Sequence, residues 1–222
     1  MTANAGRSAR HIRTLRAALL GAAFALPLAV PLAGLSATPV RAEATAKARE
    51  IAAHFSDIRT MTGSFIQFDP NGKTTEGKFY IERPGNIRFD YSGTPLRVIA
   101  DGDQVAINNR KLNTWDLYPL SKTPLKLLLG ERIDLSSASI RSVKEEPDVT
   151  TIVMGDKSVF GNSEITMLFD TATFDLRQWT IKDNDGRDTT VIVDGIRAGV
   201  KLDPGMFKIP YTAISLGQTG KK

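Results

Sequence analysis

The apolar residues near the start of the chain recur with the period of an α-helix. Within residues 43–61 the apolar side chains are spaced so that they share one helical face, and charged residues occupy the other. The apolar positions are Ala48, Ile51, Ala52, Phe55 and Ile58. We therefore predict an amphipathic helix over this segment, with its apolar face packed against the rest of the protein.

Beyond Thr62 the period of the pattern changes to two, which is the period of a β-strand. Short runs rich in β-branched and aromatic residues alternate with turns made of Gly, Pro, Asn and Asp. The predicted strands are residues 63–68, 74–83, 87–91, 96–100, 104–108, 138–144, 149–155, 164–169, 176–182 and 189–193, with 207–210 as a final edge strand. Asp-Asn-Asp-Gly at residues 183–186 is a strong hairpin signal. Turns this frequent predict an antiparallel meander.

The strand pattern is interrupted at residues 120–129. Thr123 and Pro124 are typical of an N-cap followed by proline at the first helical position, and four leucines follow before Gly130. We predict a short apolar helix here.

These elements predict a single α+β domain over residues 43–222. A sheet of about ten or eleven antiparallel strands must curl, and its concave face then needs a cover. Helices forming a lid over this apolar face would give an incomplete antiparallel β-barrel. Its interior either fills itself with side chains or holds an apolar ligand, and the pattern leaves both options open.

The first 42 residues have the composition of a secretory signal peptide. They contain five arginines and no acidic residue, and an apolar run extends over residues 17–37. We predict ordinary Sec export with cleavage after Ala42, and Ala37 is a second candidate. The alternative is an uncleaved transmembrane anchor, because the run is about long enough to span a bilayer. Two prolines within the run favour cleavage.

The charge balance changes once this segment is set aside. The full sequence has 29 Lys and Arg against 24 Asp and Glu, which gives a net charge of +5 and a pI near 9.5. Without the five arginines of the predicted signal, 24 basic residues face 24 acidic ones. The basic pI therefore does not indicate a nucleic-acid partner, and we expect none.

Residue types that catalyse reactions or bind metals are scarce. The chain has no cysteine, and His54 is the single histidine of residues 43–222. This histidine lies beside the apolar face of the first predicted helix, as boundary residues do. The acidic segments 145–148 and 183–186 are typical of solvated turns, and no nucleophile elbow, dinucleotide loop or HExxH motif occurs. We expect no enzyme activity, no metal site and no cofactor.

Residues 83–91 combine a proline turn with an aromatic strand. By the period of two, Ile87, Phe89 and Tyr91 share one face of that strand. These side chains suit either the lining of an apolar cavity or an ordinary sheet core. Arg83 is either a surface charge or a donor to main-chain carbonyls across the sheet.

At these positions the chain resembles the LolA family of periplasmic lipoprotein carriers. The likeness runs from about residue 46 to 210 in the expected order. The matching segments are Gly63-Ser64-Phe65-x-Gln67, Gly77-Lys78-Phe79, residues 83–91, Asp101-Gly102 before residues 104–107, and Thr123-Pro124 with Leu127-Leu128-Leu129. Phe89 departs from the pattern, because family members often carry tryptophan there, but an aromatic residue is retained.

The resemblance implies a cavity for lipoprotein acyl chains beneath a lid made of helices 46–60 and 124–129. The residues expected to line the cavity and the lid are Phe65, Phe79, Ile81, Ile87, Phe89, Tyr91, Trp115, Leu125, Leu128 and Leu129. The arginine of the family's Arg-Pro motif is thought to hold the lid by hydrogen bonds and to matter for release, and by position it is Arg83.

The resemblance also implies partners. They are acylated lipoproteins, an inner-membrane ABC-type transporter that releases them, and an outer-membrane acceptor in cells that have one. The chain itself has no ATPase motif, so a separate energised donor must load it. We expect a monomer in the periplasm.

The missing cysteine separates this chain from the family's anchored acceptor, which is itself a lipoprotein. Residues 31–35 resemble a lipobox, but Leu35 stands where cysteine would be needed. Two alternatives remain. One is a lipid or lipoprotein sensor of the same fold, although the 180 residues from 43 to 222 leave no room for its usual second domain. The other is an interaction module with a filled core. A lipid hydrolase would need a nucleophile and base that the sequence does not supply.

Overall fold

The computed structural model describes residues 45–135 and 139–217. The predicted signal peptide and both candidate cleavage sites lie outside the described residues. Within the described part of the chain, no helix is long and apolar enough to cross a bilayer.

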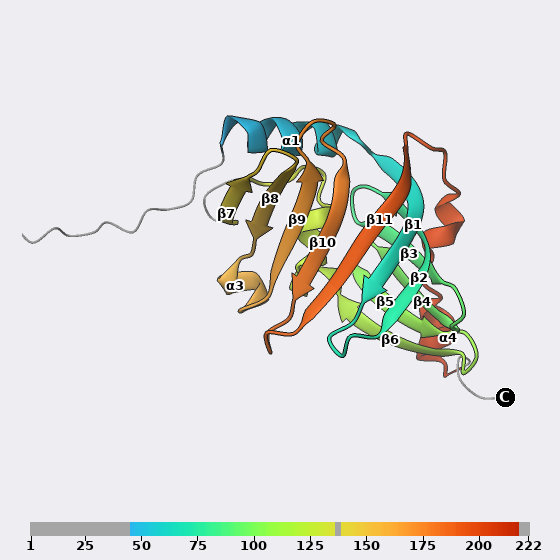
Figure 1. The fold of residues 1–222 in the computed structure, drawn as a ribbon. Coiled ribbons are helices and arrows are strands. Elements are labelled where there is room, and N and C mark those ends of the chain that lie inside the picture. Colours follow the sequence, from blue (N-terminus) through green and yellow to red (C-terminus); the bar gives the residue numbers. More distant parts are fainter. Residues whose placement is uncertain (1–44, 136–138, 218–222) are drawn as a thin grey trace, which may run out of the picture. The chain divides into compact units, whose positions relative to one another are not determined.

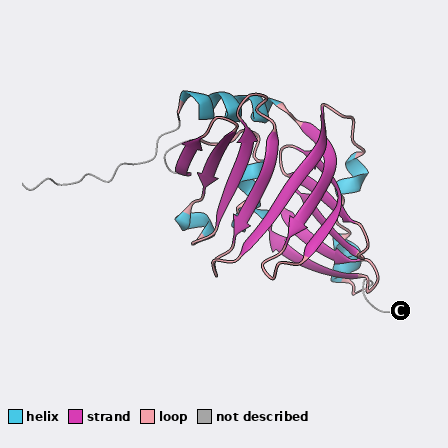
Figure 2. Ribbon diagram, viewed as in Figure 1, coloured by secondary structure: helices cyan, strands magenta, loops and turns pink. Residues whose placement is uncertain are grey.

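The described residues form one antiparallel sheet of eleven strands in the order β6-β5-β4-β3-β2-β1-β11-β10-β9-β8-β7. The strands are β1 (Thr60–Phe68), β2 (Thr74–Glu82), β3 (Asn86–Tyr91), β4 (Leu96–Asp101), β5 (Gln104–Asn109), β6 (Thr114–Pro119), β7 (Ile140–Glu145), β8 (Val149–Met154), β9 (Glu164–Asp170), β10 (Leu176–Lys182) and β11 (Asp188–Ala198). Strands β1 to β6 form a first meander and β7 to β11 a second. Pairing of β1 with β11 joins the two, and β6 and β7 remain as open edges. The sheet curls without closing (Figure 2), which confirms the predicted α+β class and incomplete barrel.

Six helices accompany the sheet in the described part of the chain. They are α1 (Ala46–Asp57), the 3₁₀-helix η1 (Leu120–Lys122), α2 (Leu125–Leu129), α3 (Lys157–Phe160), the 3₁₀-helix η2 (Pro204–Phe207) and α4 (Tyr211–Ser215). The side chain of Thr45 caps α1 by accepting a hydrogen bond from the Ala48 amide at 3.1 Å. Helix α1 lies across one end of strands β7 to β10 (Figure 1).

The structure differs from the prediction in two elements. Residues 114–119 form edge strand β6, which was not predicted from the sequence. Residues 207–210 are not a strand: the 3₁₀-helix η2 ends at Phe207, and the chain then continues to α4. Phe207 and Ile209 are buried because this segment packs on the outer face of the sheet, against Ile99 and Ala106.

A charged cluster fastens this C-terminal segment to the sheet. Asp90 accepts hydrogen bonds from Arg88 Nε and Arg97 Nε, both at 2.8 Å, and Arg88 Nη1 donates to the main-chain oxygen of Met206 at 3.1 Å. Burial acts to raise the pKa of Asp90, but the hydrogen bonds from the two arginines outweigh it and hold that pKa below its usual value.

This lowered pKa predicts a specific acid sensitivity. A carboxyl group with a lower pKa in the folded state stabilises the fold above its unfolded pKa of about 4, and the stabilisation is lost as the pH falls through the folded value. We expect the unfolding free energy of the wild type to fall more steeply below about pH 4 than that of Asp90→Asn. Urea titrations of both proteins, at several pH values on either side of about 4, the usual pKa of a carboxyl group, measure the unfolding free energies. Parallel curves would contradict it.

Candidate functional site

Aromatic side chains of strands β1, β3 and β10 meet inside the curled sheet. Phe65 on β1 lies edge-on to Phe89 and Tyr91 on β3, with ring centroids 4.8 and 5.0 Å apart. Trp179 on β10 lies 6.0 Å from Phe89 and is 2% exposed. Phe65 reaches across β2 because its partner in the ladder there is Gly77, which has no side chain. The cluster thus links both halves of the sheet.

A hydrogen-bonded polar pair stands at the margin of this cluster. The hydroxyl of Tyr91 donates a hydrogen bond to Gln67 Oε1 at 2.7 Å. Burial raises the pKa of Tyr91 to about 12, although the hydrogen bond to Gln67 acts in the opposite direction. Tyr91 is therefore neutral at physiological pH, and it brings no charge into the apolar interior.

Helices α1 and α2 close the interior. Leu128 and Leu129 of α2 are each 1% exposed. Phe55 of α1 lies edge-on to Phe169 of β9, with ring centroids 5.3 Å apart. Helix α1 therefore packs on the second meander, and α2 adds leucines to the same buried cluster.

Nine of the ten residues predicted for the cavity and lid belong to one buried cluster. They are Phe65, Phe79, Ile81, Ile87, Phe89, Tyr91, Leu125, Leu128 and Leu129. Their side chains fill the space between sheet and helices by contacting one another. The interior is thus closed over its own side chains, and an acyl chain could enter only if some of them moved.

Trp115 is the tenth residue, and its predicted place in the interior is wrong. It is paired with Asn108 on β5 and packs on the outer face with Ala106 and Phe207. Side chains alternate along β5, so Val105 faces the interior while Ala106 and Asn108 face outward. Because Trp115 is the cross-strand partner of Asn108, its side chain lies on the same outer face.

The residues predicted from the sequence to line the interior did not include those of the second meander. They include Ile152, Met154, Ile165, Met167, Phe169 and Trp179. The signal was present, since these residues alternate within the predicted strands 149–155, 164–169 and 176–182. They supply the second meander's share of the buried cluster, and Phe169 among them contacts Phe55 of α1.

Arg83 is a buried cation at the end of α1. Arg83 is only 4% exposed, and its Nη2 donates hydrogen bonds to the main-chain oxygens of Phe55 and Ile58. These carbonyls lie in and just beyond the last turn of α1, where the helix dipole favours a positive charge. The guanidinium also lies 4.1 Å from the centre of the Phe55 ring. The surface-charge alternative for Arg83 is therefore excluded.

Burial leaves this cation incompletely satisfied. Desolvation, followed by the nearby charge of Arg59, lowers the pKa of Arg83 to about 10, so it is still charged at neutral pH. Its Nε and Nη1 are buried without a hydrogen-bond partner among the described residues. Such groups oppose the closed arrangement that the two carbonyl bonds favour.

The turn that carries Arg83 also holds α2. The Arg83–Pro84 peptide is cis, and the amide of Gly85 donates to the main-chain oxygen of Leu129 at 2.8 Å. Gly85 has a φ of 86°, and a Cβ there would lie 2.6 Å from the Cα of Gly102. One turn thus contacts the C-terminal ends of α1 and α2, and we call its bonds to Phe55, Ile58 and Leu129 the latch.

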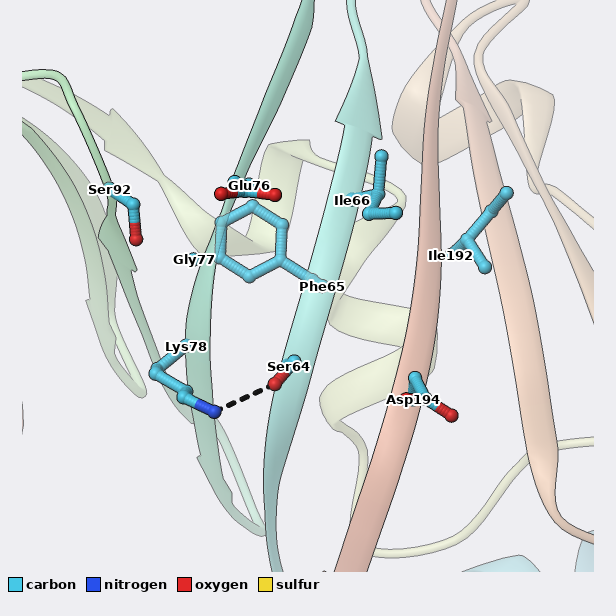
Figure 3. A pocket seen from close by; sticks show the side chains of 9 residues that line it. All are labelled: Ser64, Phe65, Ile66, Glu76, Gly77, Lys78, Ser92, Ile192 and Asp194. Atoms are coloured by element: carbon cyan, nitrogen blue, oxygen red, sulfur yellow. Dashed lines mark hydrogen bonds between the residues drawn. The ribbon is translucent and has the colours of Figure 1, made fainter.

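A separate pocket of about 340 Å³ lies on the outer face near β1, β2 and β11 (Figure 3). Its polar feature is a hydrogen bond of 2.7 Å from Lys78 Nζ to Ser64 Oγ. A serine and a lysine can form a catalytic pair when the lysine is desolvated. Lys78 is exposed, however, so nothing removes water from its ammonium group. The pair is better explained as a cross-strand contact on the sheet surface.

A family match and the most similar named relatives identify the same family. Residues 56–210 match the family described as outer membrane lipoprotein carrier protein LolA. The outer-membrane lipoprotein carrier protein of Alkalilimnicola ehrlichii is 27% identical over 196 residues, covering 84% of this chain and 89% of that protein. Its namesake from Methylococcus capsulatus is 27% identical over 179 residues, covering 76% and 85%. The crystal structure of a LolA superfamily protein from Nitrosomonas europaea aligns with a TM-score of 0.41 at 8% identity, covering 73% of this chain and 98% of that one.

Proposed function

Because this chain belongs to the LolA family of outer membrane lipoprotein carrier proteins, we propose that it is a soluble periplasmic chaperone without enzyme activity. In this role it takes up the acyl chains of lipoproteins released from the inner membrane and carries them, as a monomer, to the outer membrane. The observation that supports this most is the interior, where apolar side chains of both meanders converge beneath α1 and α2. These side chains can exchange their contacts with one another for contacts with acyl chains.

The energetics of acyl chains set the demands on such a carrier. Burying a methylene group stabilises by about 0.8 kcal/mol, so three chains of about fifteen methylenes represent an upper limit of about 36 kcal/mol. Much of this is offset, because the closed interior is already filled with apolar side chains. Because acyl chains leave a membrane only at this cost, cargo does not cross water unaided, and its extraction from the inner membrane needs an energised donor. We propose an inner-membrane ABC-type transporter for this step.

Release follows from the closed form itself. With the interior filled and the latch formed, the empty protein has a stable alternative to its loaded state. A ligand shifts this equilibrium only by the difference of its affinities for the two states. Re-formation of the latch would thus favour transfer of the acyl chains to an acceptor or to the outer membrane.

Co-purification tests the proposal directly. Protein isolated from the periplasm of cells that contain the releasing transporter should carry acylated lipoproteins, which mass spectrometry identifies. Phe89→Ala should change the amount carried, because Phe89 lies in the interior, whereas Phe68→Ala on the outer face, where the side chain is 39% exposed, should not. If wild-type protein never carries acylated protein in such cells, the carrier function is wrong.

A further inference from the structure

An apolar groove of about 570 Å³ opens at the surface beside the N-terminal end of α2. It lies between Val105 on β5, Leu125 on α2 and Ile181 on β10, next to the β10–β11 hairpin. Figure 1 shows this hairpin at the end of the strands away from α1. The groove has the size of a ligand site, for which about 300–1,000 Å³ is common.

The floor of the groove is the interior cluster itself. Val105 and Leu125 are 8% and 9% exposed and belong to the buried cluster, and Ile181 packs against it. At this place the apolar interior reaches the surface of the molecule. The pocket of about 600 Å³ on the outer face, by contrast, is lined by Lys78, Arg197 and Lys201 and by no residue of the interior cluster.

Charged and polar groups stand along the rim of the groove. Arg187 Nη2 lies 2.8 Å from Asp183 Oδ2 and 3.1 Å from Asp185 Oδ2, so one positive charge is shared by two carboxylates. Lys122 lines the opposite side. An apolar floor with a polar rim suits a ligand whose long hydrocarbon part is joined to a polar end, as acyl chains are joined to a glyceryl-cysteine.

The two sides of the groove are held differently. The hairpin is fixed, because Asp183 Oδ1 accepts from the amides of Asp185 and Arg187 at 2.9 Å, and Asn184 Oδ1 accepts from the amide of Asn162 at 2.8 Å. The opposite side is α2, a helix of five residues whose far end is held by the latch through Leu129. Opening the latch would therefore free the side of the groove that is able to move.

We propose that this groove is the portal through which acyl chains enter and leave the interior, with the glyceryl-cysteine end remaining at its rim. The proposal rests on the carrier function and adds a route to it. Helix α2 couples the portal to the latch, since Leu125 at one end lines the groove and Leu129 at the other accepts from Gly85. Displacement of α2 then both widens the entrance and uncovers the leucines of the interior.

The absence of cysteine from the chain makes the portal directly testable. Lys122→Cys places a unique thiol on the rim, and Lys73→Cys places one on the exposed turn between β1 and β2 as a control with the same change of charge. Each thiol receives a bulky polymer through a disulfide that a reductant can cleave. The probe is a dansylated, tripalmitoylated cysteinyl peptide, whose uptake is followed by fluorescence anisotropy.

We expect the polymer at residue 122 to slow uptake at least tenfold and the polymer at residue 73 to leave it unchanged. Removal of the polymer with reductant should restore the rate in the same sample, which separates a blocked entrance from a misfolded variant. Equal uptake by the two conjugates, or slow uptake that reductant does not restore, would overturn the portal while the carrier function stands. Absence of uptake by the unmodified wild type would instead remove the carrier function, and the portal with it.

Discussion

Replacing Arg83 by leucine is expected to increase the retention of acylated lipoprotein, by about 10- to 100-fold in the binding constant. The closed, empty form loses the bonds from Arg83 to the main-chain oxygens of Phe55 and Ile58. A hydrogen bond to a charged group contributes about 1.5–3 kcal/mol, and each 1.4 kcal/mol changes an equilibrium constant about tenfold. Relief of the buried, partly unsatisfied guanidinium offsets some of this loss, which is why we expect a smaller factor than two full bonds would give. Weakening the closed form relative to the loaded one favours retention.

Two further variants separate the latch from general charge effects. Arg83→Lys keeps a positive charge near the end of α1, but its single ammonium group lacks the planar fork, so we expect intermediate retention. Arg59→Leu removes a neighbouring arginine whose side chain is 55% exposed and lies 3.5 Å from Glu131, and it should change little. The measurement is the amount of lipoprotein that co-purifies with each folded variant. If Arg83→Leu retains the same amount as the wild type, the assigned role of Arg83 is wrong.

The sequence predicted best what depends on neighbours along the chain. Alternation with a period of two placed Ile87, Phe89 and Tyr91 on one face, and the structure buries that face. The same alternation does not say which face of a strand is the interior one. On β6 both Trp115 and Leu117 are apolar, but their face is the outer one, because the register with β5 decides it. Long-range pairing therefore explains the misplacement of Trp115.

The role of Arg83 shows a second limit of the sequence. The pattern left it as either a surface charge or a donor to carbonyls, because its acceptors lie 28 and 25 residues earlier in the chain. Only the packing of α1 on the curled sheet brings those carbonyls to the turn at Gly85. The C-terminal segment behaves likewise: Phe207 and Ile209 alternate with Lys208, which resembles a strand, but the two apolar side chains pack on the outer face from outside the sheet.

Gly77→Ala is expected to cost about 3–5 kcal/mol of unfolding free energy, as overpacking and loss of aromatic contacts combine. A Cβ at residue 77 would lie 2.1 Å from the main-chain oxygen of Asp90 and 2.8 Å from Cε1 of Phe65. The oxygen belongs to the backbone of β3, so β2 and β3 would have to separate. The ring would have to leave its edge-on contacts with Phe89 and Tyr91. Urea unfolding followed by circular dichroism measures the loss.

A second glycine distinguishes crowding from the general cost of removing a glycine. Gly93 follows β3 with a φ of 68°, and a Cβ there would meet no atom within 4 Å. Gly93→Ala should therefore cost only about 1 kcal/mol, the strain of a left-handed conformation. Equal midpoints for Gly77→Ala and the wild type would show that the sheet yields easily at the aromatic cluster. A large loss at Gly77 alone would mean that β1, β2 and β3 hold Phe65 in a fixed place, so that room for acyl chains must come from movement of the helices rather than of this part of the sheet.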